Sequence, residues 1–152
     1  MKKEKKILIA PLNWGLGHAV RCIPIINVFI RQGAKVILAS DGDALNLLRA
    51  EYPALECIEL PSYKIHYKTA NMFLNIAPQV PKLLKAIRLE RRFLDTIISK
   101  RKIDAIISDN RFGIHHPKVP SVYMTHQLNI PVPNRFVQAW VTGRNNRYIE
   151  SR

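Results

Sequence analysis

Cysteine is scarce in this sequence. Cys22 and Cys57 are the only two among 152 residues, and they form no CxxC pair. A disulfide framework or a cysteine-based metal site needs more thiols, so neither is expected. Long apolar runs are lacking too: none approaches the roughly 20 residues of a membrane span, and residues 7–10, behind the N-terminal lysines, are too few for a signal-peptide core. We therefore expect a cytoplasmic protein, soluble or bound peripherally at the inner face of the membrane.

Acidic residues are also few. Asp and Glu number 11 against 24 Lys and Arg, which gives a formal net charge of +13 at pH 7. Such an excess favours an anionic partner, whether a nucleic acid, a phosphorylated compound or a membrane surface. No recognition-helix or RNP-like pattern accompanies the charge, so nucleic acid is not the expected partner. The 47% hydrophobic and 23% charged content is that of one globular domain.

Five short runs rich in β-branched residues recur along the chain. Their apolar residues are continuous rather than alternating, which is typical of strands covered on both faces of a parallel sheet. The runs are KKILIA (5–10), KVILAS (35–40), LECIEL (55–60), IDAIIS (103–108) and PSVYMT (120–125). Helix-length segments separate most of them. We therefore predict an α/β fold: a Rossmann-like open parallel sheet of about five to six strands with helices on both faces.

Three segments between these runs have the pattern of helices. Residues 21–33 are expected to form the first, with Pro24 in its first turn and Gly33 as its C-terminal stop. The second should follow the capping candidates Ser40, Asp41 and Asp43 and end before Pro53.

The third helix is predicted over residues 81–101. The apolar stripe expected to cover the sheet comprises Leu83, Leu84, Ile87, Leu94 and Ile98. The opposite side mixes apolar and basic residues, namely Leu89, Phe93, Lys82, Lys85, Arg92 and Lys100. This side, with the aromatic residues of the long loop before the helix, suits an anionic bilayer, although an ordinary solvated lysine-rich face has the same composition.

The stretch LNWGLGHAVR, residues 12–21, places two glycines and a histidine where the first strand meets the first helix. One interpretation is a dinucleotide fingerprint with Gly15, Gly17 and Asp41 as the ribose acid, but Val20 stands where a third glycine belongs. The other is a catalytic base, since a neutral imidazole at a helix start can take a proton from a hydroxyl. A histidine that merely bonds to its own loop is the plain structural alternative for His18.

The wider sequence around this stretch resembles a known family. ILIAPLNWGLGH (7–18) with RCIPIINVFIRQGAKVILASDG (21–42) is similar to the amino-terminal half of GT-B-fold glycosyltransferases, near the peptidoglycan GlcNAc transferase and the UDP-glycosyltransferases. IDAIISDNRFG (103–113) followed by KVPSVYMTHQ (118–127) resembles the later strand pair of that half. The fold implied is one half of a GT-B enzyme.

The resemblance implies an acceptor-binding domain over residues 1–133 and, over 134–152, the start of a helix leading to a donor domain absent from these residues. The donor domain is expected to hold a nucleotide sugar, specifically a UDP-sugar. The acceptor-binding domain is expected to bind a glycan or glycolipid. No cofactor or metal is expected here, and His115 and His116 are taken as loop histidines. Without the donor domain, in the same or a partner chain, no sugar transfer is expected.

Site residues carried over from the family fall in the same stretches. His18 is the candidate base, and Asp109 would orient it or bind an acceptor hydroxyl, with a strand-end cap as the alternative. The expected substrate-binding residues are Asn13, Gly15, Gly17, Arg21, His126 and Gln127. Two other functions remain open: a nucleotide- or dinucleotide-binding Rossmann module, and a membrane-docking subunit of a split glycosyltransferase.

Overall fold

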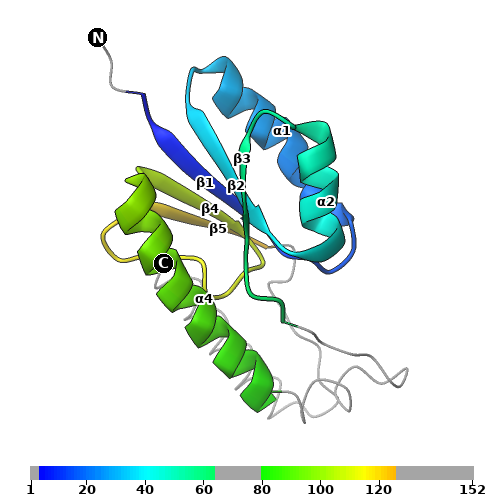
Figure 1. Cartoon of the computed structure of the whole chain (residues 1–152), viewed down its shortest axis with the longest axis vertical. Helices are drawn as coiled ribbons and strands as arrows, with labels where there is room; N and C mark the ends of the chain where they lie inside the picture. The colour runs from blue at the N-terminus through cyan, green and yellow to red at the C-terminus, as the bar shows by residue number, and fades with distance from the viewer. Residues whose placement is uncertain (1–3, 64–79, 126–152) are drawn as a thin grey trace.

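The computed structural model describes residues 4–63 and 80–125, which form a five-stranded, fully parallel sheet. The strands are β1 (Lys6–Pro11), β2 (Lys35–Ser40), β3 (Glu56–Glu59), β4 (Ala105–Asp109) and β5 (Ser121–Met124). Their order is β3-β2-β1-β4-β5, so β1 lies in the centre and the chain crosses over it to reach β4 (Figure 1). All five predicted strands and the Rossmann-like α/β class are confirmed.

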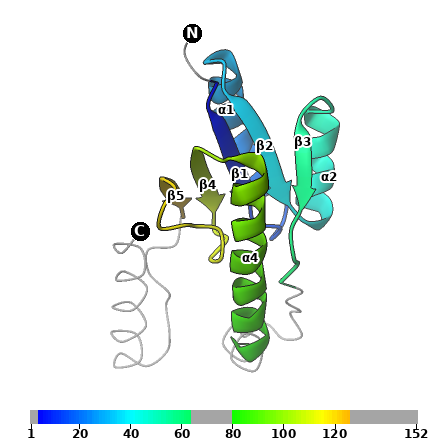
Figure 2. The same cartoon turned by 60° about the vertical axis from the view of Figure 1, so that its left-hand side comes forward.

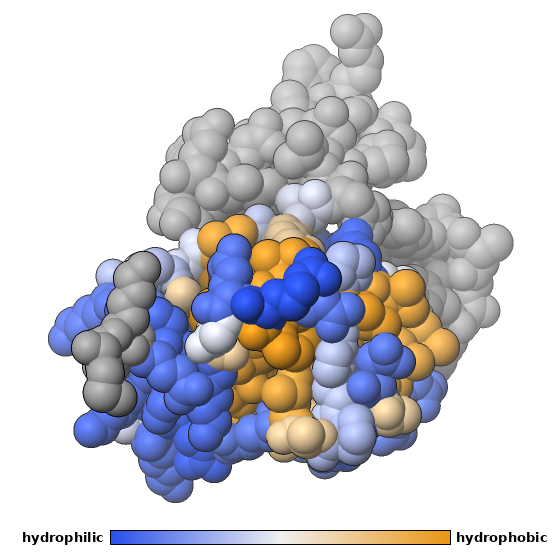
Figure 3. All heavy atoms as spheres, turned by 90° about the horizontal axis from the view of Figure 1, so that it is seen from above, coloured by the Kyte–Doolittle hydropathy of each residue, from blue (hydrophilic) through white to orange (hydrophobic). Residues whose placement is uncertain are grey.

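Helices cover both faces of the sheet (Figures 1 and 2). α1 (Gly17–Arg31) and α2 (Gly42–Glu51) pack on one face, where Ile7, Ile9 and their neighbours meet Cys22 and Ile26. α4 (Val80–Arg101) packs on the other. Because successive residues of a strand point to opposite faces and helices cover both, β1 is apolar and buried from residue 7 to residue 11. Seen from the edge where the strands begin, a band of apolar residues lies between hydrophilic ones (Figure 3).

The start of α1 differs from the prediction. The helix begins at Gly17, not near residue 21, so Pro24 lies inside it rather than in its first turn. Proline has no N–H, so Pro24 cannot donate a hydrogen bond to the carbonyl of Val20, four residues earlier. The side chains of both residues are exposed, so this carbonyl lies on the solvent side of the helix. The C-terminal stop is confirmed: Gly33 has φ +76°, and its N–H donates to the Ile30 carbonyl, as is usual for a glycine that ends a helix.

The cap predicted for α2 is confirmed in position but not in its hydrogen bond. Asp41 is the N-cap residue, but its side chain makes no capping hydrogen bond, and the Ser40 hydroxyl donates to the Pro11 carbonyl instead. The cap comes from another segment: Asn13 Oδ1 accepts a hydrogen bond from the Ala44 N–H at 3.2 Å. The bare Gly42 lets the Asn13 amide reach this position.

The third predicted helix is confirmed as α4, with one correction on its inner side. Leu83, Ile87, Leu94 and Ile98 face the protein as expected, but Leu84 is 47% exposed because it lies about 100° round the helix from Leu83. The fully buried positions include Glu90, an acid in the middle of the apolar stripe. None of the helices in the described ranges is long and apolar enough to cross a membrane.

Glu90 is buried against Arg111, which follows β4, and both side chains have no exposed surface. Arg111 Nε donates to Glu90 Oε1 at 2.5 Å. Glu90 Oε2 accepts from the Tyr63 hydroxyl at 2.6 Å and from the Gly113 N–H at 3.1 Å. Burial and the neighbouring Glu90 raise the pKa of Tyr63, so the phenol keeps the proton that it donates.

Arg111 also ties the ends of three strands together. Its Nη1 donates to Asp41 Oδ1 at 2.7 Å and lies 3.4 Å from the Pro11 carbonyl oxygen, while Nη2 donates to the Pro61 carbonyl at 2.9 Å. Burial alone would lower the pKa of Arg111, but Glu90 and Asp41 outweigh it and the pKa is raised. The guanidinium therefore remains charged, and we call Arg111, Glu90, Asp41 and Tyr63 the buried charge cluster.

The chain offers a matched test of this cluster. Arg111→Gln should lower the free energy of unfolding by about 3–5 kcal/mol, because Glu90 and Asp41 would be left as uncompensated buried charges. Arg101→Gln removes a pair with the same 2.5 Å Nε to Oε1 distance, to Glu56, but on the surface. It should cost less than about 1 kcal/mol. Equal losses in urea unfolding would show that burial of the cluster is not what matters.

Candidate functional site

The loop between β1 and α1 meets the end of β4 at the edge where the parallel strands finish. Pro11, the last residue of β1, pairs in register with Asp109, the last residue of β4. Between these two strands the connections turn to opposite sides of the sheet, which is where open α/β sheets usually bind their ligands. The β1–α1 loop contains Gly15, whose φ of +76° favours glycine, and Gly17 begins the helix.

Three predicted site residues come together at this point. His18 Nδ1 lies 3.1 Å from Asp109 Oδ2. Arg21, one turn further along α1, donates from Nε to Asp109 Oδ2 at 2.5 Å and from Nη2 to Asp109 Oδ1. Its Nη2 also lies 2.8 Å from His18 Nδ1. The sequence separates Asp109 from this helix by about ninety residues, and the parallel register of β1 and β4 brings them together.

The two contacts of His18 Nδ1 require different tautomers. A guanidinium nitrogen can only donate, so a hydrogen bond from Arg21 needs a lone pair on Nδ1 and places the imidazole proton on Nε2. A hydrogen bond to the Asp109 carboxylate needs the proton on Nδ1 and places the lone pair on Nε2. Only the second form can take a proton through Nε2, so the balance between Arg21 and Asp109 decides what His18 can do.

Asp109 dominates the electrostatics of the site. Its side chain is completely buried, whereas 34% of the Arg21 side chain is exposed. The hydrogen bond to Asp109 raises the pKa of Arg21. Burial raises the pKa of the Cys22 thiol to about 12, with the Asp109 charge adding to the effect, and the same two causes raise the pKa of Tyr123. Arg21 therefore supplies the positive charge that a buried carboxylate requires.

The other predicted binding residues lie in different surroundings. Asn13 caps α2 through its side chain, which is a structural contact. A Cβ built on Gly15 or Gly17 meets no described atom within 4 Å, so the loop surface there is open. His126 and Gln127 lie outside the described residues, as do residues 134–152 of the expected second segment.

The structure does not leave Asp41 available as the ribose-binding acid of the dinucleotide interpretation. Asp41 is 5% exposed and its carboxylate is bonded to Arg111 within the buried charge cluster. A ribose acid must be able to meet the sugar hydroxyls of a ligand, and Asp41 is engaged elsewhere. The buried charge cluster was not predicted from the sequence. An acid on the stripe that faces the sheet could have indicated it, since Glu90 lies four residues before Leu94 on α4.

Comparisons with known proteins support the fold. No family model and no curated protein sequence matches the chain. Among solved structures, it is similar to the calicheamicin glycosyltransferase CalG4, with a TM-score of 0.59 and 12% identity over 96% of this chain and 43% of that one. The glycosyltransferase SnogD from Streptomyces nogalater gives 0.57 and 12% identity over 98% and 41%.

A third structure with a similar fold comes from a protein described as a hydrogenase. The C-terminal domain (residues 78–226) of PF1911 hydrogenase from Pyrococcus furiosus gives a TM-score of 0.51 and 13% identity over 82% of this chain and 94% of that one. At such identities the likeness concerns the fold alone. The chain has the Rossmann-like fold of one half of a GT-B glycosyltransferase, and it spans about two fifths of the two glycosyltransferases it resembles.

Proposed function

We propose that the chain is the acceptor-side domain of a GT-B glycosyltransferase, in which His18 removes the proton from an acceptor hydroxyl. The observation that carries the proposal is the pairing of His18 with the buried carboxylate of Asp109, at the carboxyl edge between β1 and β4. The likeness in fold to CalG4 and SnogD supports it. A histidine that only stabilised its own loop would not need a buried acid from a distant strand.

The reaction follows from the tautomer in which Asp109 accepts the Nδ1 proton. The lone pair on His18 Nε2 takes the proton of the acceptor hydroxyl while the hydroxyl oxygen attacks the anomeric carbon of the donor sugar. The bond from that carbon to the diphosphate breaks, and the diphosphate leaves with the electron pair. Only 9% of the His18 side chain is exposed, so the acceptor must reach one edge of the ring, across the open surface at Gly15 and Gly17.

Arg21 has two roles in this scheme. It pairs with both carboxylate oxygens of Asp109 and so compensates the charge of this buried side chain. Its exposed portion gives it access to a phosphate of the donor. A guanidinium drawn toward that phosphate withdraws Nη2 from His18 Nδ1 and favours the tautomer that acts as a base.

The sugar donor belongs on a second domain in this proposal. We assign it as a UDP-sugar held by a Rossmann-like donor domain, in the same chain or in a partner chain, and the acceptor as a glycan or glycolipid. The leaving diphosphate needs stabilising groups from the donor side. The described residues alone are therefore not expected to transfer sugar.

Substitution of the proposed base tests the mechanism. With a donor-binding domain, UDP-glucose or UDP-N-acetylglucosamine, and a panel of glycan and glycolipid acceptors, His18→Ala should lower kcat/KM by about 10²–10⁴-fold, the usual contribution of a general base. Release of UDP is the readout.

The matched control is Tyr52→Phe. The Tyr52 hydroxyl contacts the Ile23 carbonyl and Asn27 on the same helix, away from the site, so its loss loosens α1 without touching His18. Its kcat/KM should stay within about threefold of the parent. If His18→Ala retained parental turnover while remaining folded by circular dichroism, His18 would have no part in the chemistry.

A specific observation also favours a membrane surface as a partner, with the protein on the cytoplasmic side. Leu89 and Phe93 on α4 are 45% and 38% exposed. Lys82 precedes Leu89 by seven residues and Lys100 follows Phe93 by seven, so both lysines lie on the same side of the helix as these apolar residues. Lys85 lies beside them. Exposed apolar side chains flanked by lysines suit the headgroup layer of an anionic bilayer. A lipid-linked acceptor would then be met where it resides.

Vesicle sedimentation tests this face. The chain should bind phosphatidylcholine vesicles only when they contain phosphatidylglycerol, and Leu89→Gln with Phe93→Ser should lower the partition coefficient about tenfold through lost apolar burial. Leu84→Gln is the control, because Leu84 is equally exposed on the same helix but about 140° away from Leu89. Equal losses in both variants would exclude this face as the contact.

A further inference from the structure

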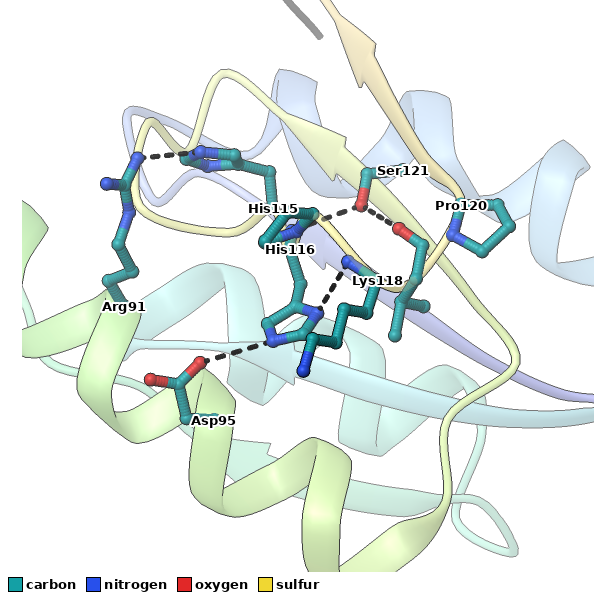
Figure 4. A pocket seen from close by; sticks show the side chains of 9 residues that line it. Arg91, Asp95, His115, His116, Lys118, Pro120 and Ser121 are labelled. Carbon is teal, nitrogen blue, oxygen red and sulfur yellow. Dashed lines mark hydrogen bonds and ion pairs between the residues drawn. The ribbon is translucent and has the colours of Figure 1, made fainter.

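A cavity of about 1030 Å³ lies away from the His18 site, between α4 and the loop that joins β4 to β5 (Figure 4). The loop carries the chain from the carboxyl end of β4 back to the start of β5. Pro120 ends the loop beside β4, where its carbonyl accepts from the Ile106 N–H at 2.9 Å. The cavity is therefore on the α4 side of the sheet, toward the edge where the strands begin.

The loop wall of this cavity is held in shape by its own bonds. The Val119 N–H donates to the His116 carbonyl at 3.2 Å and closes a tight turn. The Ser121 hydroxyl donates to the Val119 carbonyl at 2.8 Å and accepts from the His116 N–H at 3.3 Å. Pro117 within this turn and Pro120 directly after it restrict the backbone. A wall fixed in this way loses little conformational freedom when a ligand binds.

Polar groups line both walls of the cavity, in one group at Arg91 and His115 and another at Asp95, His116 and Lys118 (Figure 4). From α4, Arg91 Nη2 donates to His115 Nε2 at 2.6 Å. His116 Nδ1 accepts from the backbone N–H of Lys118 at 3.1 Å, so the neutral ring carries its proton on Nε2. That Nε2 lies 3.7 Å from Asp95 Oδ1, with 60% of the Asp95 side chain exposed.

The charge balance of the lining is positive. Arg91 and Lys118 contribute two full positive charges against one negative charge from Asp95. His116 adds an N–H donor, and Ser121 adds a hydroxyl. A guanidinium, an ammonium, an imidazole N–H and a hydroxyl are the groups that proteins use to bind phosphate oxygens. The overall charge of +13 would also draw an anion toward the protein.

We infer that this cavity binds a phosphate monoester. The space, about 1030 Å³, lies just above the usual range for small-molecule sites, roughly 300–1,000 Å³, so the ligand carries an organic group besides its phosphate. That group would pack on Val119 and the two prolines, while the phosphate meets the Lys118 ammonium and the His116 N–H. The site is separate from His18 and does not depend on the function proposed above.

Calorimetric titration with glycerol 3-phosphate tests the site, and vesicles containing phosphatidic acid present the same monoester as a lipid headgroup. Lys118→Gln should weaken binding about tenfold through loss of a charged contact. Asp95→Asn should strengthen binding severalfold, since it removes the negative charge of the lining, and a folding defect would not produce a gain. Arg88→Gln is the matched control, an exposed arginine on α4 outside the cavity.

Binding of either probe with this pattern supports the site, and the probe that binds identifies a soluble or a lipid source. The proposal is overturned if neither probe binds. It is also overturned if Arg88→Gln weakens binding as much as Lys118→Gln, or if Asp95→Asn leaves the affinity unchanged, because general charge attraction would then account for the result.

Discussion

The pairing of Arg111 with Glu90 and Asp41 joins the segments at the carboxyl edge of the sheet. One guanidinium, with no exposed surface, binds α4 through Glu90 and the segment after β2 through Asp41. It also donates to the carbonyl of Pro61, just beyond β3. Single partners could not be removed without leaving a buried charge unpaired, so the cluster allows one arrangement of these segments. The sheet edge that carries the proposed site is therefore rigid on the α4 side.

Two arginines compensate the buried acids, one on each face of the sheet. Arg111 forms ion pairs on the α4 face, while Arg21 forms an ion pair with Asp109 on the α1 face. Asn110, which has a positive φ of 56°, lies between Asp109 and Arg111 and turns the chain from one system to the other. The closed system on the α4 face fixes the strand ends. The partly exposed Arg21 leaves the other system able to respond to a ligand, which is the property that the proposed base requires.

Local pattern was enough to predict the sheet and the three helices, because continuous β-branched runs and helical spacing are properties of neighbouring residues. It also placed His18 at the right edge. What it could not give was the partner of each polar side chain, which depends on tertiary register. Asn13 caps α2 from a different loop, Asp41 pairs with Arg111 rather than capping its own helix, and Glu90 on the apolar side of α4 pairs with the same arginine. The resemblance to glycosyltransferases indicated Asp109, and the parallel pairing of β1 and β4 explains its position.

The most direct test of the account is the protonation of the His18 imidazole in its neutral form, observed by two-bond proton–nitrogen correlation NMR of the nitrogen-15 labelled chain and assigned with His18→Ala. The account predicts that the proton resides on Nδ1, held by Asp109, with the lone pair on Nε2. A proton on Nε2, with Nδ1 accepting from Arg21 even when a phosphate ligand is present, would contradict it, because such a ring cannot deprotonate a sugar hydroxyl.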